Sequence, residues 1–414
     1  MSYALISIIG LILAIVIGVK RKVNVGVISL FFAFVLSFFV FNMKIKTVYA
    51  KGWPVGIFFI MMAAMFLFSF ANVNGTTKLL AEKLAYAIKG NVRILPLVFF
   101  LATVFMTACG ADPSIAAFML PVALYIGEEA GMKPIILCVS IIAGADVGGC
   151  SPIAVIGIVT SGLAAKGGVT NYWPIWAATA TTMILLCIIV YFVFGGYKVK
   201  TVVLAETAKP QKFNVKQLQT LCTVLFVICL IIFVKVDIGG AAFIGVAIML
   251  MLGTANEKEA IKSINWNVLI MVGGTGVLVY VMTEVGGVKM LGKFLASVMT
   301  KHTAAPLMAI LAGAMTSVSS ATGVVMPALF PTIPSIVKEM HGAVSPIELM
   351  QVLQAGSLGS VSYSPLSALG AMAMATIPEH VNKEKLFTQL LIMAVAGLAL
   401  TVLLSFLGVF RLFI

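Results

Sequence analysis

Small polar residues interrupt the apolar stretches of this 414-residue chain twice in its first half and twice in its second. The four strings cover residues 106–114, 143–152, 315–323 and 355–365. Backbone groups freed at such breaks must be satisfied by something other than lipid. Unwound carbonyls and hydroxyls can bind a cation there, and the positive ends of the adjoining half-helices suit a carboxylate. Matching interruptions in two halves are typical of secondary transporters with an inverted repeat.

Asp112 and Asp146 are the only acidic residues deep inside predicted apolar segments of the first half. A carboxylate at membrane depth is costly unless it is paired or coordinated, so each is a candidate cation or proton site. Asp112 precedes Pro113, a combination common at helix starts, and capping is therefore an alternative role that is compatible with cation binding. Asp146 could instead satisfy the backbone at a helix break.

The interruptions supply two sets of candidate site residues. Isolated Ser or Thr residues usually bond back to their own helix, whereas clusters at a break are available to ligands. The cation site is predicted from Thr107, Gly110, Asp112, Asp146, Gly148, Gly149, Ser317, Gly323 and Gly359. The substrate site is predicted from Asp112, Ser114, Ser151, Pro152, Ser319, Ser320, Thr322, Ser362 and Ser364. Glycines of the first set would permit tight backbone turns. No Arg or Lys lies in the interruptions, so helix ends and hydroxyls would hold an anionic substrate.

The composition excludes an ordinary soluble domain, because 61% of the residues are hydrophobic and only 10% are charged. The apolar runs do not alternate as in a β-barrel, so an all-α polytopic membrane protein is predicted. The net charge of +13 is attributed to topology and membrane lipid headgroups, and no nucleic acid is expected as a partner. No nucleophile–base pair or metal cluster is visible, so neither an enzyme nor an organic cofactor or metal centre is predicted.

Hydrophobic lengths divide the chain into two similar halves joined by a polar linker. The predicted units are a first repeat at 1–195, a cytoplasmic linker at 196–216 and a second repeat at 217–414. Each half would carry a re-entrant helical hairpin, at about 92–127 and 304–338, followed by a broken helix, at about 133–165 and 345–377. Amphipathic helices at 76–90 and 287–300 would lie at the membrane interface. Full spans are predicted at about 3–19, 23–42, 53–73, 172–195, 217–234, 238–254, 266–284 and 386–410.

The number of membrane crossings determines whether the two halves are inverted, and the charge distribution indicates which side each end faces. Each half has an odd number of crossings, so the two repeats would be inverted in the membrane. The distribution of Lys and Arg favours N- and C-termini on the outer side, with the linker in the cytoplasm. This orientation places the first hairpin on the cytoplasmic side and the second on the outer side.

Several short motifs resemble the ion transporter superfamily, and within it the divalent anion:sodium symporter-like permeases. The resemblance is closest to the MatC-type malonate/dicarboxylate carriers. It is carried by Arg21-Lys22-Val23-Asn24-Val25-Gly26, Trp53-Pro54, Asn74-Gly75-Thr76 and Ile264-Asn265-Trp266, and it extends over nearly the whole chain. It implies an elevator-type transporter that is normally a homodimer, in a bacterial or archaeal inner (plasma) membrane. It also implies cation-driven uptake of a small dicarboxylate.

The hairpin tips depart from that family pattern. Sodium-dicarboxylate members carry Ser-Asn-Thr at each tip. The first tip here has Ala111-Asp112-Pro113, and the second offers Ser317-Val318-Ser319 or Ser319-Ser320-Ala321. An ionised Asp112 would repel a dianion unless a cation lay between them or the carboxyl were protonated.

The sequence therefore predicts symport of a small dicarboxylate or related organic anion with a monovalent cation. Na⁺ is favoured over H⁺ as the coupling ion. The alternative is a Na⁺/H⁺ antiporter of the same superfamily, in which Asp112 and Asp146 would exchange the two cations without an organic substrate.

Overall fold

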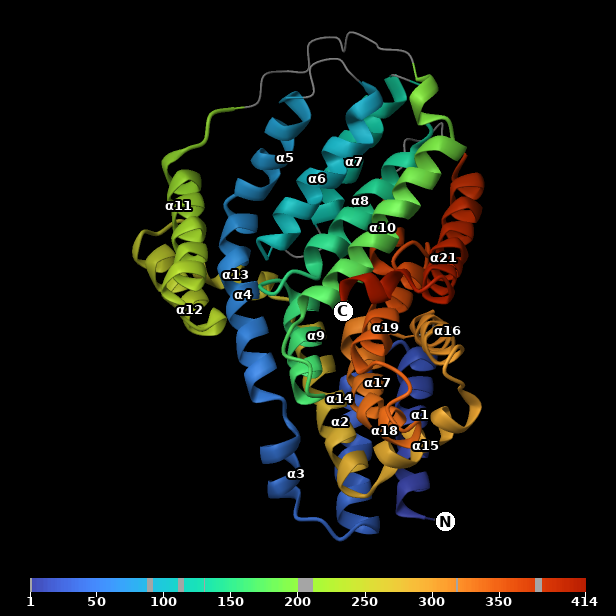
Figure 1. The fold of residues 1–414 in the computed structure, drawn as a ribbon. Coiled ribbons are helices and arrows are strands. Elements are labelled where there is room, and N and C mark those ends of the chain that lie inside the picture. Colours follow the sequence, from blue (N-terminus) through green and yellow to red (C-terminus); the bar gives the residue numbers. More distant parts are fainter. Residues whose placement is uncertain are drawn as a thin grey trace.

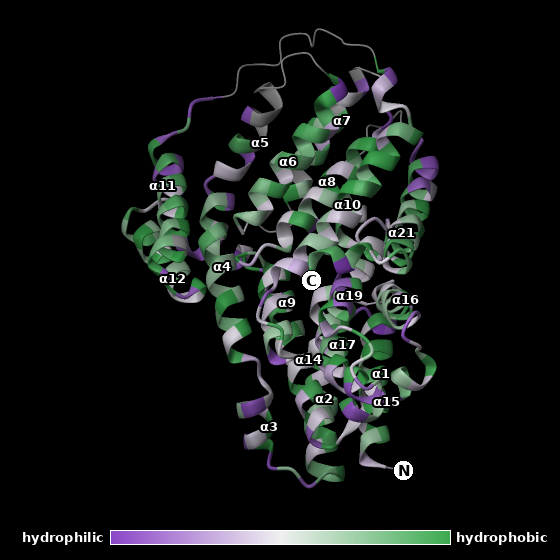
Figure 2. Ribbon diagram, in the orientation of Figure 1, coloured by the Kyte–Doolittle hydropathy of each residue, from purple (hydrophilic) through white to green (hydrophobic). Residues whose placement is uncertain are grey.

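The computed structural model describes residues 2–87, 92–110, 115–129, 131–199, 211–317, 319–376 and 382–414. Within these ranges the chain forms helices joined by short connections, and no strand occurs (Figure 1). Hydrophobic residues cover the helices along most of their length, while hydrophilic residues gather at helix ends and in connections (Figure 2). This distribution suits helices that stand in lipid and end in the interfacial regions.

The helices occur in the same order in the two halves of the chain. The first half contains α1 (Tyr3–Arg21), α2 (Val25–Val35), η1 (Leu36–Val40), α3 (Ile45–Gly52), α4 (Val55–Val73), α5 (Thr76–Ala87), η2 (Val92–Ile94), α6 (Leu95–Ala108), α7 (Ala116–Glu129), α8 (Pro134–Gly149), α9 (Val155–Lys166), α10 (Trp173–Val193) and η4 (Gly196–Lys198). The second contains α11 (Val215–Cys229), η5 (Leu230–Val234), α12 (Ile238–Met251), α13 (Glu257–Ser263), α14 (Trp266–Glu284), α15 (Gly287–Val298), α16 (Ala304–Thr316), η6 (Ala321–Val325), α17 (Met326–Leu329), η7 (Phe330–Thr332), α18 (Ile333–Glu339), α19 (Pro346–Val361), α20 (Ala368–Ala375), α21 (Lys383–Phe406) and η8 (Val409–Phe413).

Six helices among the described residues are long and apolar enough to cross a membrane. Helices α1, α4, α10, α14 and α21 coincide with predicted spans, and the remaining candidate, Ala321–Glu339, lies in the predicted second hairpin. The spans predicted at 23–42, 217–234 and 238–254 are shorter apolar helices, Val25–Val40, Val215–Cys229 and Ile238–Met251. The chain is thus a multi-pass α-helical membrane protein.

Polar caps and prolines determine where many helices begin. At the start of α11, Asn214 accepts a hydrogen bond from the Gln217 amide at 2.9 Å, and the Gln217 side chain accepts one from the Asn214 amide at 3.0 Å. This reciprocal pair satisfies two backbone donors that a helix start leaves free. Pro134 and Pro346 lie in the first turns of α8 and α19, where the missing amide hydrogen costs nothing. The two broken helices therefore start in the same way.

The helices form two packed groups, each drawing on both halves of the chain. In the first group α2 packs on α14 and α4 on α12, so helices far apart in sequence lie side by side (Figure 1). In the second group α6 packs on α8, α16 on α19, and α10 on α19. One continuous apolar cluster runs through this second group, from Val92 to Phe410. Helix α9 reaches across and contacts α4 of the first group.

The two helix breaks lie later than the sequence suggested. The break predicted at 146–152 falls between the end of α8 and the start of α9, at residues 150–154, and the one predicted at 360–365 falls at 362–367. The second hairpin tip is shorter than the predicted 317–323, because the chain turns helical again at Ala321. Helix α8 continues past Asp146 to Gly149, and Gly148 in this last turn lets α6 pack closely against it.

Candidate functional site

Asp146 lies in the last turn of α8, just before the first break. It is 2% exposed, and its Oδ2 atom has no hydrogen-bond partner among the described residues. Ser362, the first residue after α19, lies near this carboxylate. The two breaks therefore meet at this acidic group. A buried carboxylate with a free oxygen is costly in a bilayer unless a cation or proton neutralises it.

The first hairpin is held against the first break by hydroxyl groups. Thr107, at the end of α6, is fully buried and donates to the Thr103 carbonyl at 2.7 Å, while the Gly144 carbonyl of α8 lies 3.3 Å from its hydroxyl. Ser151, in the break, donates to the Ala108 carbonyl at 2.6 Å. Its neighbour Pro152 is exposed and shows no polar contact. The predicted residues Thr107 and Ser151 are thus brought together with the hairpin arm, although their hydroxyl hydrogens are used within the protein.

Two predicted residues of the first tip, Asp112 and Ser114, lie outside the described residues. Their roles stay predictions. Gly110 immediately precedes that tip in the sequence. It has a backbone φ of +96°, and its amide donates to the Thr107 carbonyl at 2.9 Å. A Cβ atom at Gly110 would also collide with the Phe68 ring. Glycine is therefore required here for conformation and for space.

The glycines predicted to permit tight turns serve different purposes. Only Gly110 among them has a positive φ. Gly148 and Gly149 lie inside α8, Gly359 inside α19 and Gly323 in the π-helical turn η6. A Cβ at Gly148 would collide with the Thr107 hydroxyl and the Val104 carbonyl, and one at Gly323 would meet Met271 of α14. A Cβ at Gly359 would lie 3.2 Å from the Gly397 carbonyl of α21. For Gly148, Gly323 and Gly359 the prediction of tight turns is wrong, because these glycines allow helices to approach.

The second tip carries one free hydroxyl and one structural cap. Ser319 Oγ is buried and has no hydrogen-bond partner among the described residues. Ser320 caps η6 by accepting from the Gly323 amide at 3.0 Å, and the Gly323 carbonyl accepts from the Thr275 hydroxyl of α14 at 2.7 Å. Ser317 bonds back to the Gly313 carbonyl at 2.8 Å and is exposed. Ser319 is therefore the hydroxyl of this tip that is available to a ligand.

Thr322, the other predicted residue of this tip, lies in the first turn of η6 and is half-buried. Behind the tip, Thr316 at the end of α16 lies 2.9 Å from the Ser360 hydroxyl of α19. This contact holds the second hairpin against the second broken helix.

The second break has the same local geometry as the first. A Cβ at Gly370 would collide with the Ser364 carbonyl, and a Cβ at Gly157 would collide with the Ser151 carbonyl. In each case a serine followed by proline turns its carbonyl against the first turn of the next half-helix. Ser364 also accepts from the Leu366 amide at 3.3 Å, and the Ser362 carbonyl accepts from Ser367.

Buried polar residues of α19 form a part of the site region that the sequence interpretation missed. Gln354 accepts from the Tyr172 hydroxyl at 3.0 Å and donates to Thr179 at 3.0 Å, so α19 is joined to α10. Ser357 Oγ, one turn further, is buried and has no hydrogen-bond partner in the described chain. The sequence contained a signal for these residues, namely amide and hydroxyl side chains at every third position of an apolar helix. Each such side chain is costly in lipid without a partner.

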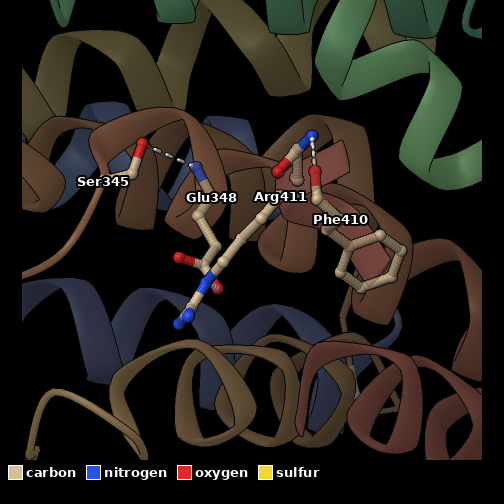
Figure 3. Close-up of polar contacts among 5 residues, drawn as sticks. Ser345, Glu348, Phe410 and Arg411 are labelled. Atoms are coloured by element: carbon tan, nitrogen blue, oxygen red, sulfur yellow. Dashed lines mark hydrogen bonds and ion pairs between the residues drawn. The ribbon is translucent and has the colours of Figure 1, made fainter. Parts of the chain in front are cut away.

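An ion pair fixes the other end of α19 (Figure 3). Ser345 caps the start of α19 by accepting from the Glu348 amide at 3.4 Å, and the Glu348 carboxylate accepts from Arg411 Nε at 2.9 Å. The Glu348 side chain is 7% exposed and that of Arg411 is 53% exposed. Gln351 donates to the Phe410 carbonyl at 3.0 Å. The C-terminal turn η8 is thereby tied to the broken helix.

The available polar atoms of the region suit a cation and an anion better than a transition metal. Free oxygen atoms come from Asp146, Ser319 and Ser357, on three elements that border the two breaks. The described residues contain no group of three or more His, Cys, Asp or Glu side chains that could hold a metal ion. Hard oxygen ligands are the kind that alkali cations use.

Residues 1–149 match the sequence family described as the N-terminus of the dicarboxylate carrier protein MatC. The fold is similar to that of the Alcanivorax borkumensis YdaH transporter, with a TM-score of 0.58 and 16% identity over 88% of this chain and 87% of that chain. It is also similar to Neisseria gonorrhoeae MtrF, described as illuminating a class of antimetabolite efflux pumps, with a TM-score of 0.59 and 12% identity over 88% of this chain and 83% of that one. No curated protein matches the chain in sequence.

These comparisons confirm the resemblance to MatC-type carriers for the first 149 residues. The family matched over residues 1–149 is a carrier family, and the two similar folds are those of transport proteins.

Proposed function

We propose that the protein is a cation-coupled symporter of a small dicarboxylate or related organic anion, with Na⁺ as the coupling ion. The observation that carries the proposal is the buried Asp146 carboxylate, whose Oδ2 atom is free of protein hydrogen bonds where the two helix breaks meet. A cation bound there would neutralise the carboxylate and supply a positive charge for the substrate. Binding of one ion would then depend on the other, which is the basis of coupled transport.

The anion would bind between the two hairpin tips and the half-helices that follow the breaks. Helix α9 begins after the first break and α20 after the second, and each presents free amide groups at its start. Ser319 and Ser362 would add polar contacts on the side of the second half. Asp112 and Ser114 are proposed for the same site on the strength of their sequence position alone.

The proposed mechanism is an elevator between two inverted repeats. It is supported by the recurring order of helices and by the equivalent contacts of Gly157 and Gly370. The group built on α6–α10 and α16–α21 would move as the transport domain. The group built on α2, α4, α12 and α14 would remain as the scaffold of each subunit in a homodimer.

The test is uptake of labelled malonate and succinate by proteoliposomes under an imposed Na⁺ gradient or an imposed pH gradient. The proposal expects accumulation with the Na⁺ gradient and its loss in Asp146→Asn. Asp237→Asn is the matched control, because Asp237 is an exposed cap of α12. Accumulation driven only by the pH gradient would show that H⁺, and not Na⁺, is the coupling ion at Asp146.

The same carboxylate would serve a Na⁺/H⁺ antiporter, because a single buried acid can bind the two cations in turn. Absence of dicarboxylate counterflow together with Na⁺-dependent proton movement would establish that alternative and overturn symport.

A further inference from the structure

A cavity of about 330 Å³ lies where the two packed helix groups meet. Its first wall is formed by α4, α14 and the end of α3, and its second by α9. Three prolines of the second hairpin, Pro327, Pro331 and Pro334, close the remaining side. Pockets for small ligands range from about 300 to 1,000 Å³, so a small organic ion fits.

Two lysines from opposite walls line this cavity. Lys51 is in the last turn of α3, and Lys166 is the last residue of α9. Both side chains are exposed, and neither is ion-paired within the part of the chain that the structure describes. Glu284, the last residue of α14, follows the lining residue Thr283 but does not itself line the cavity. Apolar walls focus the field of such charges and raise the local concentration of an oppositely charged ion.

The cavity is lined by residues that neighbour the second hairpin tip in sequence or in contact. Gly276 of α14 lines it, and the preceding residue, Thr275, holds the Gly323 carbonyl of the tip. Pro327, the second residue after η6, also lines the cavity. The cavity wall is therefore linked through α14 to the tip that the proposed substrate site uses.

We propose that this cavity is a carboxylate-binding vestibule, in which Lys51 and Lys166 collect a small dicarboxylate before it enters the site between the tips. The inference rests on the proposed function. The vestibule supplies the cationic groups that the four polar interruptions of the apolar stretches lack. A lysine ammonium is a compact, hydrated charge that holds a carboxylate without a fixed geometry, which suits a site of passage.

The first experiment measures the local potential without any transport. Thr283 lines the cavity and is exposed, so Thr283→Cys places a reporter thiol there. Its labelling rate in nanodiscs is compared for an anionic and a cationic methanethiosulfonate, after subtraction of the rate of the protein without this cysteine. We expect the anionic preference to fall about fivefold or more in Lys51→Gln/Lys166→Gln.

Lys46→Gln is the matched control. Lys46 lies on the same helix as Lys51 and is exposed, but it does not line the cavity. It removes one positive charge, where the double variant removes two, and the anionic preference should stay within twofold of the original. If the preference for the anionic reagent is equal in the Lys51→Gln/Lys166→Gln protein and in the Lys46→Gln protein, the proposal of a vestibule is refuted.

The second experiment tests the substrate. In proteoliposomes, Lys51→Gln and Lys166→Gln should each raise the KM for malonate about fivefold with little change in maximal rate, whereas Lys46→Gln should leave KM unchanged. Wild-type KM values in both lysine variants would overturn the inference and leave the proposed function standing. The double lysine variant could lose the anionic labelling preference as expected while the unsubstituted protein transports no dicarboxylate. That result would support an anion vestibule and count against the proposed substrate.

Discussion

The substitution Asp146→Asn removes a charge while keeping the shape of the side chain. The carboxylate is 2% exposed and one of its oxygens is unpartnered, so a bound Na⁺ would be its main source of compensation. Two unit charges about 4 Å apart interact by about 4 kcal/mol at an effective dielectric constant of about 20. Since about 1.4 kcal/mol is a tenfold change in affinity, the substitution should weaken Na⁺ binding roughly 10³-fold.

The same substitution should act in the opposite direction on the protein without Na⁺. A buried carboxylate that lacks a partner costs free energy, and the amide removes this cost. The variant should therefore be at least as stable as the wild type in Na⁺-free buffer. The wild type should gain about 2.7 kcal/mol when Na⁺ is present at about 100 times its Kd, and the variant should gain almost nothing.

Thermal unfolding of the purified protein measures both effects. Melting temperatures would be compared in sodium and choline chloride at equal ionic strength, with Asp237→Asn as the control for loss of an exposed acid. A Na⁺-dependent rise in melting temperature that persists in Asp146→Asn at the wild-type concentration would refute the reasoning. So would an Asp146→Asn protein that is less stable than the wild type without Na⁺, because it would mean that the carboxylate is already compensated inside the protein.

Three further substitutions test the contacts around the breaks. Gly148→Ala should destabilise the protein by about 1–3 kcal/mol and stop transport, because its methyl group would push α8 from α6; an unchanged melting temperature would contradict this. Thr275→Val leaves the Gly323 carbonyl without its hydroxyl partner, at a cost of about 1–3 kcal/mol, so amide exchange in η6 should accelerate about tenfold; equal exchange would show that the bond does not hold the tip. Arg411→Gln should destabilise the protein more than the double substitution with Glu348→Gln does, because the single change leaves a buried carboxylate unpaired; a lower melting temperature for the double variant would refute the ion pair as a stabilising link.

The approximate positions of the two helix breaks were predictable because glycine, proline and serine act locally. Ser151 with Pro152 and Ser364 with Pro365 interrupt apolar runs that would otherwise continue as single helices, and the structure breaks both helices there. Asp146 was identifiable for a similar reason, since an acid in an apolar run is rarely without a purpose. The exact helix ends depend on which neighbour packs against them, and this information is not local.

The functions of the individual glycines were not predictable from the sequence. A glycine that allows a turn and a glycine that lets two helices touch look the same in an apolar run. Gly110 has a positive φ, whereas Gly148 lies in a regular helix against Thr107, and only the tertiary structure separates these cases. The link between Gln354 and Tyr172 was missed because their partners lie far apart in sequence, although the cost of a buried amide could have identified Gln354.

An asymmetry between the halves follows from the proposed repeat. The equivalent contacts of Gly157 and Gly370 place Gly359 at the position in α19 that Asp146 occupies in α8. The half with the carboxylate can neutralise a cation, while the half with the glycine instead packs closely against Gly397 of α21. If the two breaks together form one site, the first would hold the coupling cation and the second would be left to contact the anion through its hydroxyls. The two ions would then meet between Asp146 and Ser362, where the first break approaches the second.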